Sequence, residues 1–247
     1  MDSLSLIIPA YNEEKRLELS LLKSLEYCRT NIRDWEIIYV DDGSTDHTFE
    51  ILSSYQGSNP ELRILRHSAN YGKGRAVRTG MTAAVKDVLL FSDADFSTPI
   101  EEAVRLYGIL KDGVDVVIGS RGVPGANVEI RQSWIRETTG KLGNVVVQTL
   151  LPLPFEDTQC GFKMFRANAA RCILPALTID GFAFDIEMLV IAVNHGLKII
   201  EAPVTWRNVL ESKVKPVHNM QVLLDVFRIR YRLAMGEYGP LLPLNTD

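Results

Sequence analysis

The sequence predicts an α/β protein with a mostly parallel sheet covered by helices on both faces. Short apolar runs alternate with helical patterns over the first 120 residues, which is typical of βαβ units. Two acidic clusters follow directly after apolar runs, where parallel sheets collect ligand-binding residues. The 247-residue chain is 46% hydrophobic and 23% charged, as expected for a globular protein that buries a full core.

Five short apolar runs are predicted to be the strands of this part of the chain. They are Leu4–Pro9, Trp35–Val40, Leu62–Arg66, Val88–Phe91 and Val114–Ile118. Helices are predicted between them, from Asn12 to about Thr30, from Asp46 to about Tyr55, from Gly74 to Lys86 and from Pro99 to Lys111. Asn12 and Asp46 are N-cap residues in this interpretation, because Asn and Asp side chains accept hydrogen bonds from the first helical N–H groups.

The regular alternation ends at Ser120. Gly, Pro and Asn are frequent in Gly122–Asn127, which predicts a mobile loop. Helices are then predicted at Arg136–Leu150, Phe184–His195 and Met220–Arg232, and strands at Gly161–Arg166 and Lys198–Pro203. Since no internal repeat is found, we predict one domain over residues 1–247.

The charge distribution argues against a general nucleic-acid binder. The chain has 31 acidic and 27 basic residues, a net charge of −4, whereas such binders are usually basic. Between Lys198 and Met235, seven bases outnumber three acids, so this part carries +4 and the remainder −8. A basic segment on an acidic body indicates an anionic ligand or surface, with an ordinary solvated face as the alternative.

Cysteine usage and hydropathy exclude two further classes. The three cysteines form no Cys-x-x-Cys pair, which argues against a disulfide framework and a zinc site. The longest uncharged stretch, Leu142–Phe155, has 14 residues, fewer than the roughly 20 needed to span a bilayer. The sequence starts Met-Asp-Ser and runs directly into a predicted strand, so no signal peptide is expected and a cytoplasmic location is predicted.

The acidic clusters are the strongest chemical signal. Asp93 and Asp95 are two residues apart at a predicted strand end, where their side chains point the same way. Their oxygen ligands suit Mg²⁺ or Mn²⁺, and the alternative is a loop cap. Asp41 and Asp42 follow the neighbouring strand and could accept hydrogen bonds from a nucleobase or ribose, with simple turn formation as the alternative.

A glycine-containing segment, Asn70–Gly74, precedes a predicted helix. It has neither the spacing of a Walker loop nor the third glycine of a dinucleotide-binding fingerprint. We therefore interpret its glycines as positions of close packing beside the site.

These segments together resemble the family 2 glycosyltransferases of the GT-A fold. The similarity is strongest to the polyprenyl-phosphate transferases, which include dolichyl-phosphate glucose and mannose synthases. The matching segments are, in order, Ile8–Glu14, Val40–Ser44, Asn70–Gly74, Asp93–Asp95, Gly119–Arg121, Asp157–Lys163, Phe184–Glu187 and Ser212-Lys213. Asp157–Lys163 looks most like the dolichyl-phosphate glucose branch. The ordered set covers nearly the whole chain, although each segment alone is common.

The resemblance implies a Rossmann-like GT-A domain in which residues 1–120 bind a nucleotide sugar and residues 121–235 bind the acceptor and face the membrane. The nucleotide-sugar contacts that it implies are Pro9, Ala10, Tyr11, Glu13, Asp41, Asp42, Lys73, Asp93, Ala94 and Lys213. Asp93 and Asp95 would hold Mg²⁺ or Mn²⁺ on the diphosphate, and the cation would act as a Lewis acid. Ser97 stands where mannose-type relatives commonly have Gln.

The implied acceptor is a polyprenyl phosphate. Arg121 and Arg131 match basic positions that the family uses for the phosphate, and the arginine fork suits that group. Asp157 matches the proposed catalytic carboxylate, which could act as a base, orient the acceptor or stabilise positive charge on the sugar. Asp185 and Glu187 belong to a matching segment, but they could equally stabilise a helix start.

A membrane-bound acceptor requires access to a membrane surface. Met220–Leu233 combines an apolar set with three arginines, which is typical of an interfacial helix. The apolar set consists of Val222, Leu223, Val226, Phe227, Ile229 and Leu233. Leu142–Leu153 is a second apolar candidate, and core helices are the alternative for both. We expect a peripheral protein on the cytoplasmic face of the membrane.

The predicted activity is an inverting transfer of a hexose, glucose from UDP-glucose, onto a polyprenyl phosphate. Within the family, the alternatives are GDP-mannose as the donor or a soluble carbohydrate as the acceptor. Outside it, the alternatives are a phosphatase with Asp93 as the nucleophile and a non-catalytic nucleotide-binding subunit.

Overall fold

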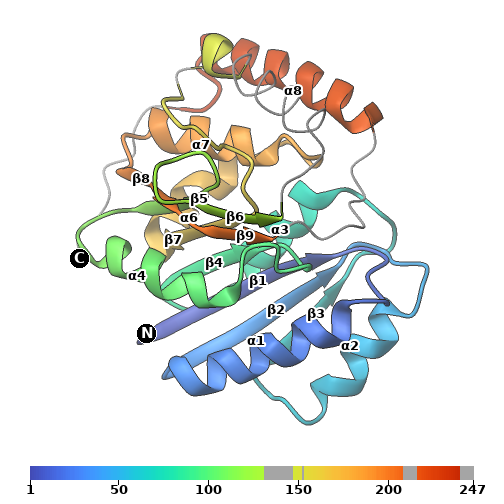
Figure 1. The fold of residues 1–247 in the computed structure, drawn as a ribbon. Coiled ribbons are helices and arrows are strands. Elements are labelled where there is room, and N and C mark those ends of the chain that lie inside the picture. The colour runs from blue at the N-terminus through green and yellow to red at the C-terminus, as the bar shows by residue number, and fades with distance from the viewer. Residues whose placement is uncertain (131–146, 152, 208–215, 240–247) are drawn as a thin grey trace.

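The computed structural model describes residues 1–130, 147–151, 153–207 and 216–239. Strands and helices alternate from residue 3 to residue 120, as predicted (Figure 1). These elements are β1 (Ser3–Ala10), α1 (Leu17–Asn31), β2 (Asp34–Asp41), α2 (Thr48–Gln56), β3 (Leu62–Arg66), α3 (Lys73–Ala83), β4 (Val88–Ser92), the 3-10 turn η1 (Ile100–Glu102), α4 (Ala103–Lys111) and β5 (Val116–Ser120).

The elements after β5 supply the last two strands of the sheet, a separate pair of strands and helices that cover one face of the sheet. They are β6 (Asn127–Ile130), β7 (Phe162–Arg166), α6 (Ala167–Ile173), the 3-10 turn η2 (Leu174–Ala176), α7 (Phe184–Asn194), β8 (Ile199–Pro203), β9 (Thr205–Arg207) and α8 (Pro216–Ala234). None of the helices in the described ranges is long and apolar enough to cross a membrane.

The central sheet has seven strands in the order β3-β2-β1-β4-β7-β5-β8. Its pairs are parallel except those of β7, which runs antiparallel to β4 and to β5. β6 and β9 form a separate two-stranded parallel sheet. The predicted mostly parallel sheet is therefore confirmed, with one reversed strand, β7, between β4 and β5.

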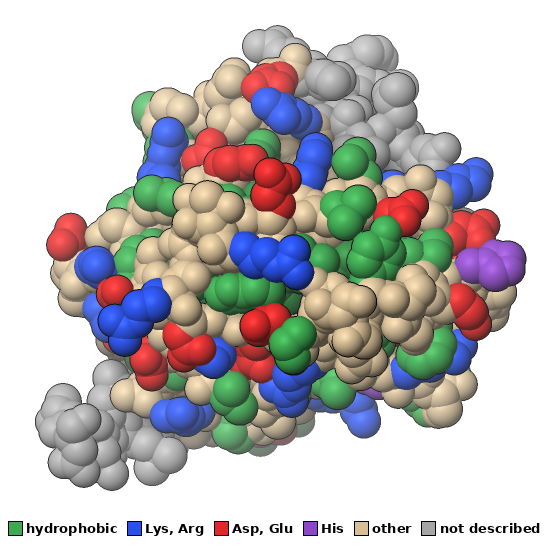
Figure 2. Space-filling model, turned by 90° about the horizontal axis from the view of Figure 1, so that it is seen from below, with side chains coloured by type: hydrophobic (Ala, Val, Ile, Leu, Met, Phe, Trp, Pro, Cys, Tyr) green, Lys and Arg blue, Asp and Glu red, His purple; other side chains and the backbone are tan. Residues whose placement is uncertain are grey.

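Helices cover both faces of the sheet (Figure 1). On β1, Leu4, Leu6 and Ile8 face a core shared with α1 and α4, while Ile7 faces the core shared with α3 and α7. Burial on both faces explains why the strands read as continuous apolar runs. α8 lies outside α7, whereas the face seen from below carries interspersed side chains of both charges (Figures 1 and 2).

The first helix begins later than predicted. α1 starts at Leu17 instead of Asn12, and Asn12 adopts a left-handed conformation with φ 54°. The N–H groups of Asn12 and Glu13 donate to Ser44 Oγ at 2.9 Å and Thr48 Oγ1 at 2.7 Å. Side chains from the β2–α2 connection thus satisfy the backbone that was expected to start the helix, and residues 11–16 form a loop at the end of β1.

Other boundaries differ less. α3 ends at Ala83, where the Arg63 side chain bonds the Ala83 carbonyl oxygen at 2.8 Å, so the helix does not reach Lys86. β5 starts two residues later than predicted, at Val116. β6, α6 and β9 were not predicted, since β6 begins at the edge of the expected loop and all three are short.

The predicted interfacial segments are partly core. Of the six apolar residues selected on 220–233, Val226 and Ile229 are buried, and Val222 and Leu233 pack against the same cluster. This happens because α8 is apolar on two faces and one of them covers α7. The described part of the second candidate, with Val147, Leu151 and Leu153, is buried in that cluster too. The remainder of that segment, and all of the predicted helix at 136–150 before residue 147, lies outside the described residues.

Candidate active site at the carboxyl edge of the sheet

The carboxyl edge of the sheet gathers the acidic clusters. β2 and β4 flank β1, so Asp42 after β2 and Asp93 after β4 lie on either side of the end of β1. Because β7 runs antiparallel to β4 and β5, the residues before β7 come to this same edge. Asp157 and Arg121 meet there, the first from the segment before β7 and the second from the end of β5.

Asp42 organises the turn that follows β3. Its buried carboxylate accepts the N–H groups of Tyr71 at 3.1 Å and Gly72 at 2.8 Å. His67 Nδ1 lies 2.7 Å from the same carboxylate, and His67 Nε2 lies 3.0 Å from Thr79 Oγ1. His67 therefore links the Asp42 carboxylate to Thr79 of α3.

Asp41 has a different local role. It is fully buried, accepts the N–H of Ser44 at 2.9 Å and lies 3.1 Å from Arg66 Nε. This is the turn geometry that its position also allowed. The remaining residues predicted on this side of the site are Pro9, Ala10, Tyr11 and Glu13. Pro9 and Ala10 end β1, the Ala10 carbonyl accepts the N–H of Asp42 at 2.8 Å, and Glu13 is bonded to Arg16.

The turn after β3 joins the two acidic clusters. While Gly72 is bonded to Asp42, the neighbouring Lys73 places its Nζ 2.6 Å from Asp93 Oδ1. The predicted role of the glycines as close-packing positions is confirmed. A Cβ on Gly72 would lie 2.4 Å from the Asp180 carbonyl oxygen, and one on Gly74 would lie 2.6 Å from the Phe184 Cβ.

The Asp93 carboxylate lies between the Lys73 ammonium group and the backbone of Gly161. A Cβ on Gly161 would lie 2.0 Å from Asp93 Oδ2, so only glycine leaves room for this carboxylate. Burial raises the pKa of Asp93; Lys73 opposes this, and the negative charges of Asp95 and Asp185 add to it. The net pKa of Asp93 is above its usual range, because the effect of burial exceeds the opposing effect of the Lys73 charge.

The donor set of Asp93 and Asp95 fits a divalent cation. Mg²⁺ is usually held by one or two carboxylates together with substrate phosphates, so a pair is sufficient when a diphosphate shares the ion. Asp95 accepts the Ser97 N–H at 2.9 Å and lies 3.7 Å from Arg16 Nη1. No cluster of three acidic, His or Cys ligands exists within the ranges that the structure describes. The carboxylate oxygens of the pair therefore suit Mg²⁺ or Mn²⁺.

Arg121 and Asp157 form a two-pronged ion pair. Arg121 Nε and Nη2 lie 2.6 and 2.8 Å from the two oxygens of Asp157, whose Oδ2 also accepts the Arg121 N–H. Burial would raise the pKa of Asp157, but the charge and hydrogen bonds of Arg121 bring that pKa below its usual range. Glu201 accepts the Asp157 N–H at 2.8 Å, and the Arg121 guanidinium lies 5.5 Å from the Trp206 ring centre. Asp157 is thus held as an ionised partner of Arg121.

Several side chains of the site were not predicted. Lys163 is fully buried on β7, where it donates to Asp185 of α7 and to the Cys160 carbonyl oxygen. A lone lysine in an otherwise apolar predicted strand is a usable signal, because a buried charge requires a partner. Glu201 and His67 gave no such signal, since their roles arise from contacts distant in sequence. Arg131 and Lys213 lie outside the described residues.

Residues 5–174 match the model of a known protein family, Glycosyl transferase family 2. The chain belongs to this family. Among curated relatives of this glycosyltransferase, the dolichyl-phosphate beta-glucosyltransferase of Dictyostelium discoideum is 34% identical over 94% of this chain and 75% of its own length. The enzymes of the same name from Saccharomyces cerevisiae and Homo sapiens are each 31% identical over 95% of this chain, and 76% and 77% of their own lengths.

Solved structures confirm the GT-A fold of this glycosyltransferase. The glucosyl-3-phosphoglycerate synthase of Mycobacterium tuberculosis in complex with UDP aligns with a TM-score of 0.66 at 19% identity, over 93% of this chain and 80% of that one. Its complex with Mn²⁺, UDP-glucose and phosphoglyceric acid aligns with a TM-score of 0.64 at 18% identity, over 98% and 81%.

Proposed function

We propose that this glycosyltransferase moves glucose from UDP-glucose to a polyprenyl phosphate of the dolichyl class, with inversion and with a divalent metal. The observation that carries the proposal is the Tyr71–Lys73 turn, which bonds Asp42 at one end and Asp93 at the other. A nucleoside site and a diphosphate site joined in this way suit one extended nucleotide sugar. The relatives support the acceptor, since they are named dolichyl-phosphate beta-glucosyltransferases.

In the proposed donor complex, Asp42 and the end of β1 hold the base and ribose. Asp93 and Asp95 would hold Mg²⁺ or Mn²⁺, which would supply positive charge to the diphosphate leaving group. Lys73, already beside Asp93, contributes a further positive charge to the same group. The remaining proposed donor contacts are Pro9, Ala10, Tyr11, Glu13, Asp41, Ala94 and Lys213, the last of which lies outside the described residues.

The proposed acceptor site is built around Arg121. An acceptor phosphate monoester has a second pKa near 6, so most of it is already dianionic at pH 7 and needs no strong base. We assign Asp157 to holding the Arg121 fork, which then orients the phosphate, and Arg131 to the same phosphate. A phosphate oxygen forms a bond to the anomeric carbon on the face opposite UDP, while the carbon–oxygen bond to UDP breaks and its electron pair leaves with UDP. One displacement of this kind inverts the anomeric carbon.

A transfer assay tests the reaction. The purified protein is incubated with a short polyprenyl phosphate, Mn²⁺ or Mg²⁺ and radiolabelled UDP-glucose, and the lipid product is extracted. Transfer from UDP-glucose is expected, with none after chelation of the metal. Transfer only from GDP-mannose, or only to a soluble sugar, would establish one of the alternatives and contradict this proposal. Asp95→Asn is the matched inactive variant, because it keeps the shape of the side chain.

We also propose that α8 docks on the membrane that contains the acceptor. Six of the twelve exposed large apolar side chains among the described residues lie between 220 and 235, and each is 37–63% exposed. They are Met220, Leu223, Leu224, Phe227, Tyr231 and Met235. Apart from the adjacent Leu223 and Leu224, they are three or four residues apart, which places them along one side of α8 and of the residue that follows it. We name them the outer stripe.

The charges of α8 support an anionic lipid surface as the partner. Arg228 and Arg230 are exposed next to the outer stripe. Arg228 is paired at 2.7 Å with the buried Asp225, the only acidic residue in 216–234, so Arg230 is the charge that this pair leaves for a lipid headgroup. The stripe differs from the apolar set selected from the sequence, because Leu223 and Phe227 are the only members common to both. The predicted position on the cytoplasmic face stays a prediction.

Flotation with vesicles tests the docking surface. The wild-type protein is expected to float with phosphatidylcholine–phosphatidylserine vesicles at low salt and less at high salt, since about 0.1 M salt screens charges beyond roughly 10 Å. The double variant Leu224→Glu, Phe227→Glu should not float. Leu19→Glu, at an apolar residue of α1 that is 63% exposed, should float normally. Absence of wild-type binding at low salt, or self-association through this stripe, would overturn the assignment.

A further inference from the structure

Glu187 bonds two segments that flank it in the sequence, 178–179 and 232–238. It lies in the first turn of α7 and is 0% exposed. One carboxylate oxygen accepts the N–H groups of Thr178 at 2.8 Å and Ile179 at 2.7 Å. The other accepts the Thr178 hydroxyl at 2.7 Å and, from the far side, Tyr238 Oη at 3.0 Å and Arg232 Nη1 at 3.1 Å. This carboxylate therefore fixes the chain at 178–179 between α7 and α8.

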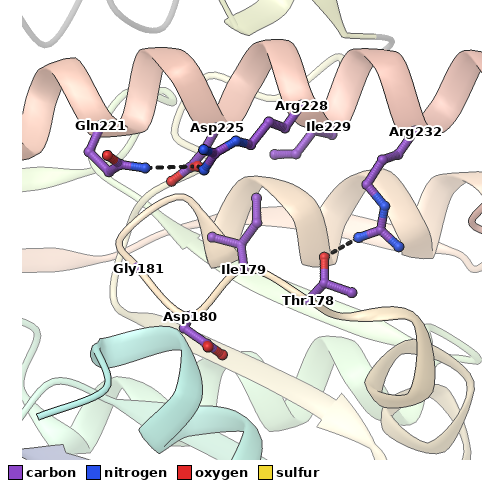
Figure 3. A pocket seen from close by; sticks show the side chains of 9 residues that line it. All are labelled: Thr178, Ile179, Asp180, Gly181, Gln221, Asp225, Arg228, Ile229 and Arg232. Atoms are coloured by element: carbon purple, nitrogen blue, oxygen red, sulfur yellow. Dashed lines mark hydrogen bonds and ion pairs between the residues drawn. The ribbon is translucent and has the colours of Figure 1, made fainter.

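The chain held by Glu187 forms the 178–181 turn, which lines a cavity of about 380 Å³ beneath α8 (Figure 3). In the close-up, Thr178 points towards Arg232 of α8, whereas Asp180 points away from α8. Asp180 instead bonds Arg78 of α3 at 2.7 Å through its carboxylate, and its carbonyl oxygen accepts the Arg75 N–H at 3.2 Å. The turn thus lies between α8 on one side and the start of α3 on the other.

The other side of this turn supports the proposed donor site. A Cβ on Gly72 would lie 2.4 Å from the Asp180 carbonyl oxygen, and one on Gly74 would lie 2.5 Å from that of Ile179. Because the two backbones approach each other this closely, the backbone of 179–180 determines the position of the Gly72–Gly74 backbone. That segment is the one that donates to Asp42 and places Lys73 beside Asp93.

We infer that Glu187 is a positioning residue for the donor site, acting through the 178–181 turn on the Tyr71–Lys73 turn. The inference rests on the proposed function, since it assumes that these residues bind the nucleotide sugar. Glu187 touches no reacting group. Its carboxylate holds the 178–181 turn, and Gly72 and Gly74 pack against that turn.

Hydrogen exchange of the full-length protein tests this without a ligand. Glu187→Gln keeps the size of the side chain but removes the charge that accepts five donors. Under native conditions, local opening determines exchange in such turns, so exchange should become faster in peptides covering 178–181 and also 70–75. Unchanged exchange at 70–75, together with faster exchange at 178–181, would overturn the inference.

Glu36→Gln is the matched control. Glu36 is likewise a buried carboxylate that accepts a hydroxyl, a backbone N–H and an arginine, from Ser5, Val85 and Arg63, but it lies at the opposite end of β2. Both variants are expected to lower the unfolding temperature, and only Glu187→Gln should affect 70–75. Tyr238→Phe, which removes one donor and keeps the carboxylate, should give a smaller effect in the same peptides if Glu187→Gln does not fold.

Calorimetric titration with UDP and Mn²⁺ supplies the functional readout. Glu187→Gln should weaken UDP binding about tenfold, the size typical of residues that orient direct ligands, while Glu36→Gln leaves it unchanged. Equal affinity of the wild type and Glu187→Gln would overturn the inference. A wild-type protein that binds no UDP, with exchange at 70–75 still dependent on Glu187, would contradict the proposed donor and leave the positioning role supported.

Discussion

Gly161 and Asp93 show how a single residue controls the site at the smallest scale. Asp93 Oδ2 occupies the space where any other residue at 161 would carry its Cβ, at 2.0 Å. The Asp93 N–H also donates to the Gly161 carbonyl oxygen at 3.0 Å, so the two backbones cannot separate without breaking this bond. Asp93 must move if a methyl group is added at 161.

Gly161→Ala is predicted to weaken UDP-glucose binding in the presence of Mn²⁺ by about 10- to 100-fold, because it displaces a proposed metal ligand. Calorimetry measures this. Gly108→Ala is the control. Its added Cβ has no atom within 4 Å beyond its chain neighbours and the backbone of its own helix, and α4 should gain up to about 1 kcal/mol of stability. Equal donor affinity of Gly161→Ala and the wild type would contradict the assignment of Asp93.

Asp157→Asn is predicted to lower kcat by about 10²-fold, because Arg121 loses the charge that holds its fork. The pKa of Asp157 lies below its usual range, so this group stays ionised as the pH falls from 8 to about 5. The fall in rate at acidic pH should then reflect protonation of the acceptor phosphate, near pH 6. It should be the same in the wild type and in Asp157→Asn. A fall in rate at acidic pH that is present in the wild type and absent from Asp157→Asn would instead identify Asp157 as a base.

At the scale of elements, a buried ion pair joins β7 to α7. Lys163 and Asp185 have side chains that are 0% and 4% exposed. Removing one member leaves an unpaired buried charge, which costs about 3–5 kcal/mol, whereas replacing both by apolar residues is often neutral. The pair lies near Asp93, because Lys163 also donates to the carbonyl oxygen of Cys160, the neighbour of Gly161, against which Asp93 packs.

Lys163→Met is predicted to lower the free energy of unfolding by about 3–5 kcal/mol. The double variant Lys163→Met, Asp185→Leu should recover most of that loss. Urea unfolding followed by circular dichroism measures both. A double variant no more stable than Lys163→Met would mean that packing, and not the unpaired charge, causes the loss.

At the scale of the whole molecule, donor binding should stabilise the fold only when the metal is present. UDP at 100 times its dissociation constant adds about 2.7 kcal/mol, which corresponds to a rise in unfolding temperature of about 5–10 °C for a chain of this length. UDP with Mn²⁺ is expected to produce this rise in a thermal melt, and a chelator should reverse it. The same rise in unfolding temperature with UDP in the presence of the chelator would argue against a metal at Asp93 and Asp95.

The sequence predicted the sheet of the first 120 residues well, because apolar runs and turn residues are local signals. The placement of Asp42 and Asp93 at the same edge of the sheet followed from a general rule on parallel strands. By contrast, the start of α1 was wrong, since Ser44 and Thr48 take the N–H groups of residues 12 and 13. The reversed direction of β7 and the Lys73–Asp93 contact could not be predicted, because neither leaves a pattern in nearby residues.

The position of β7 has a consequence for how the chain assembles as it is made. β5 has no contact in the sheet with β4, since β7 lies between them and is synthesised more than 40 residues after β5 ends. A nascent chain that has released β1 to β5 can therefore close only the four-stranded half, β3-β2-β1-β4. Gly161, which packs against Asp93, is synthesised together with β7. The proposed metal-binding carboxylates Asp93 and Asp95 therefore reach their final surroundings only when the two halves of the sheet are joined.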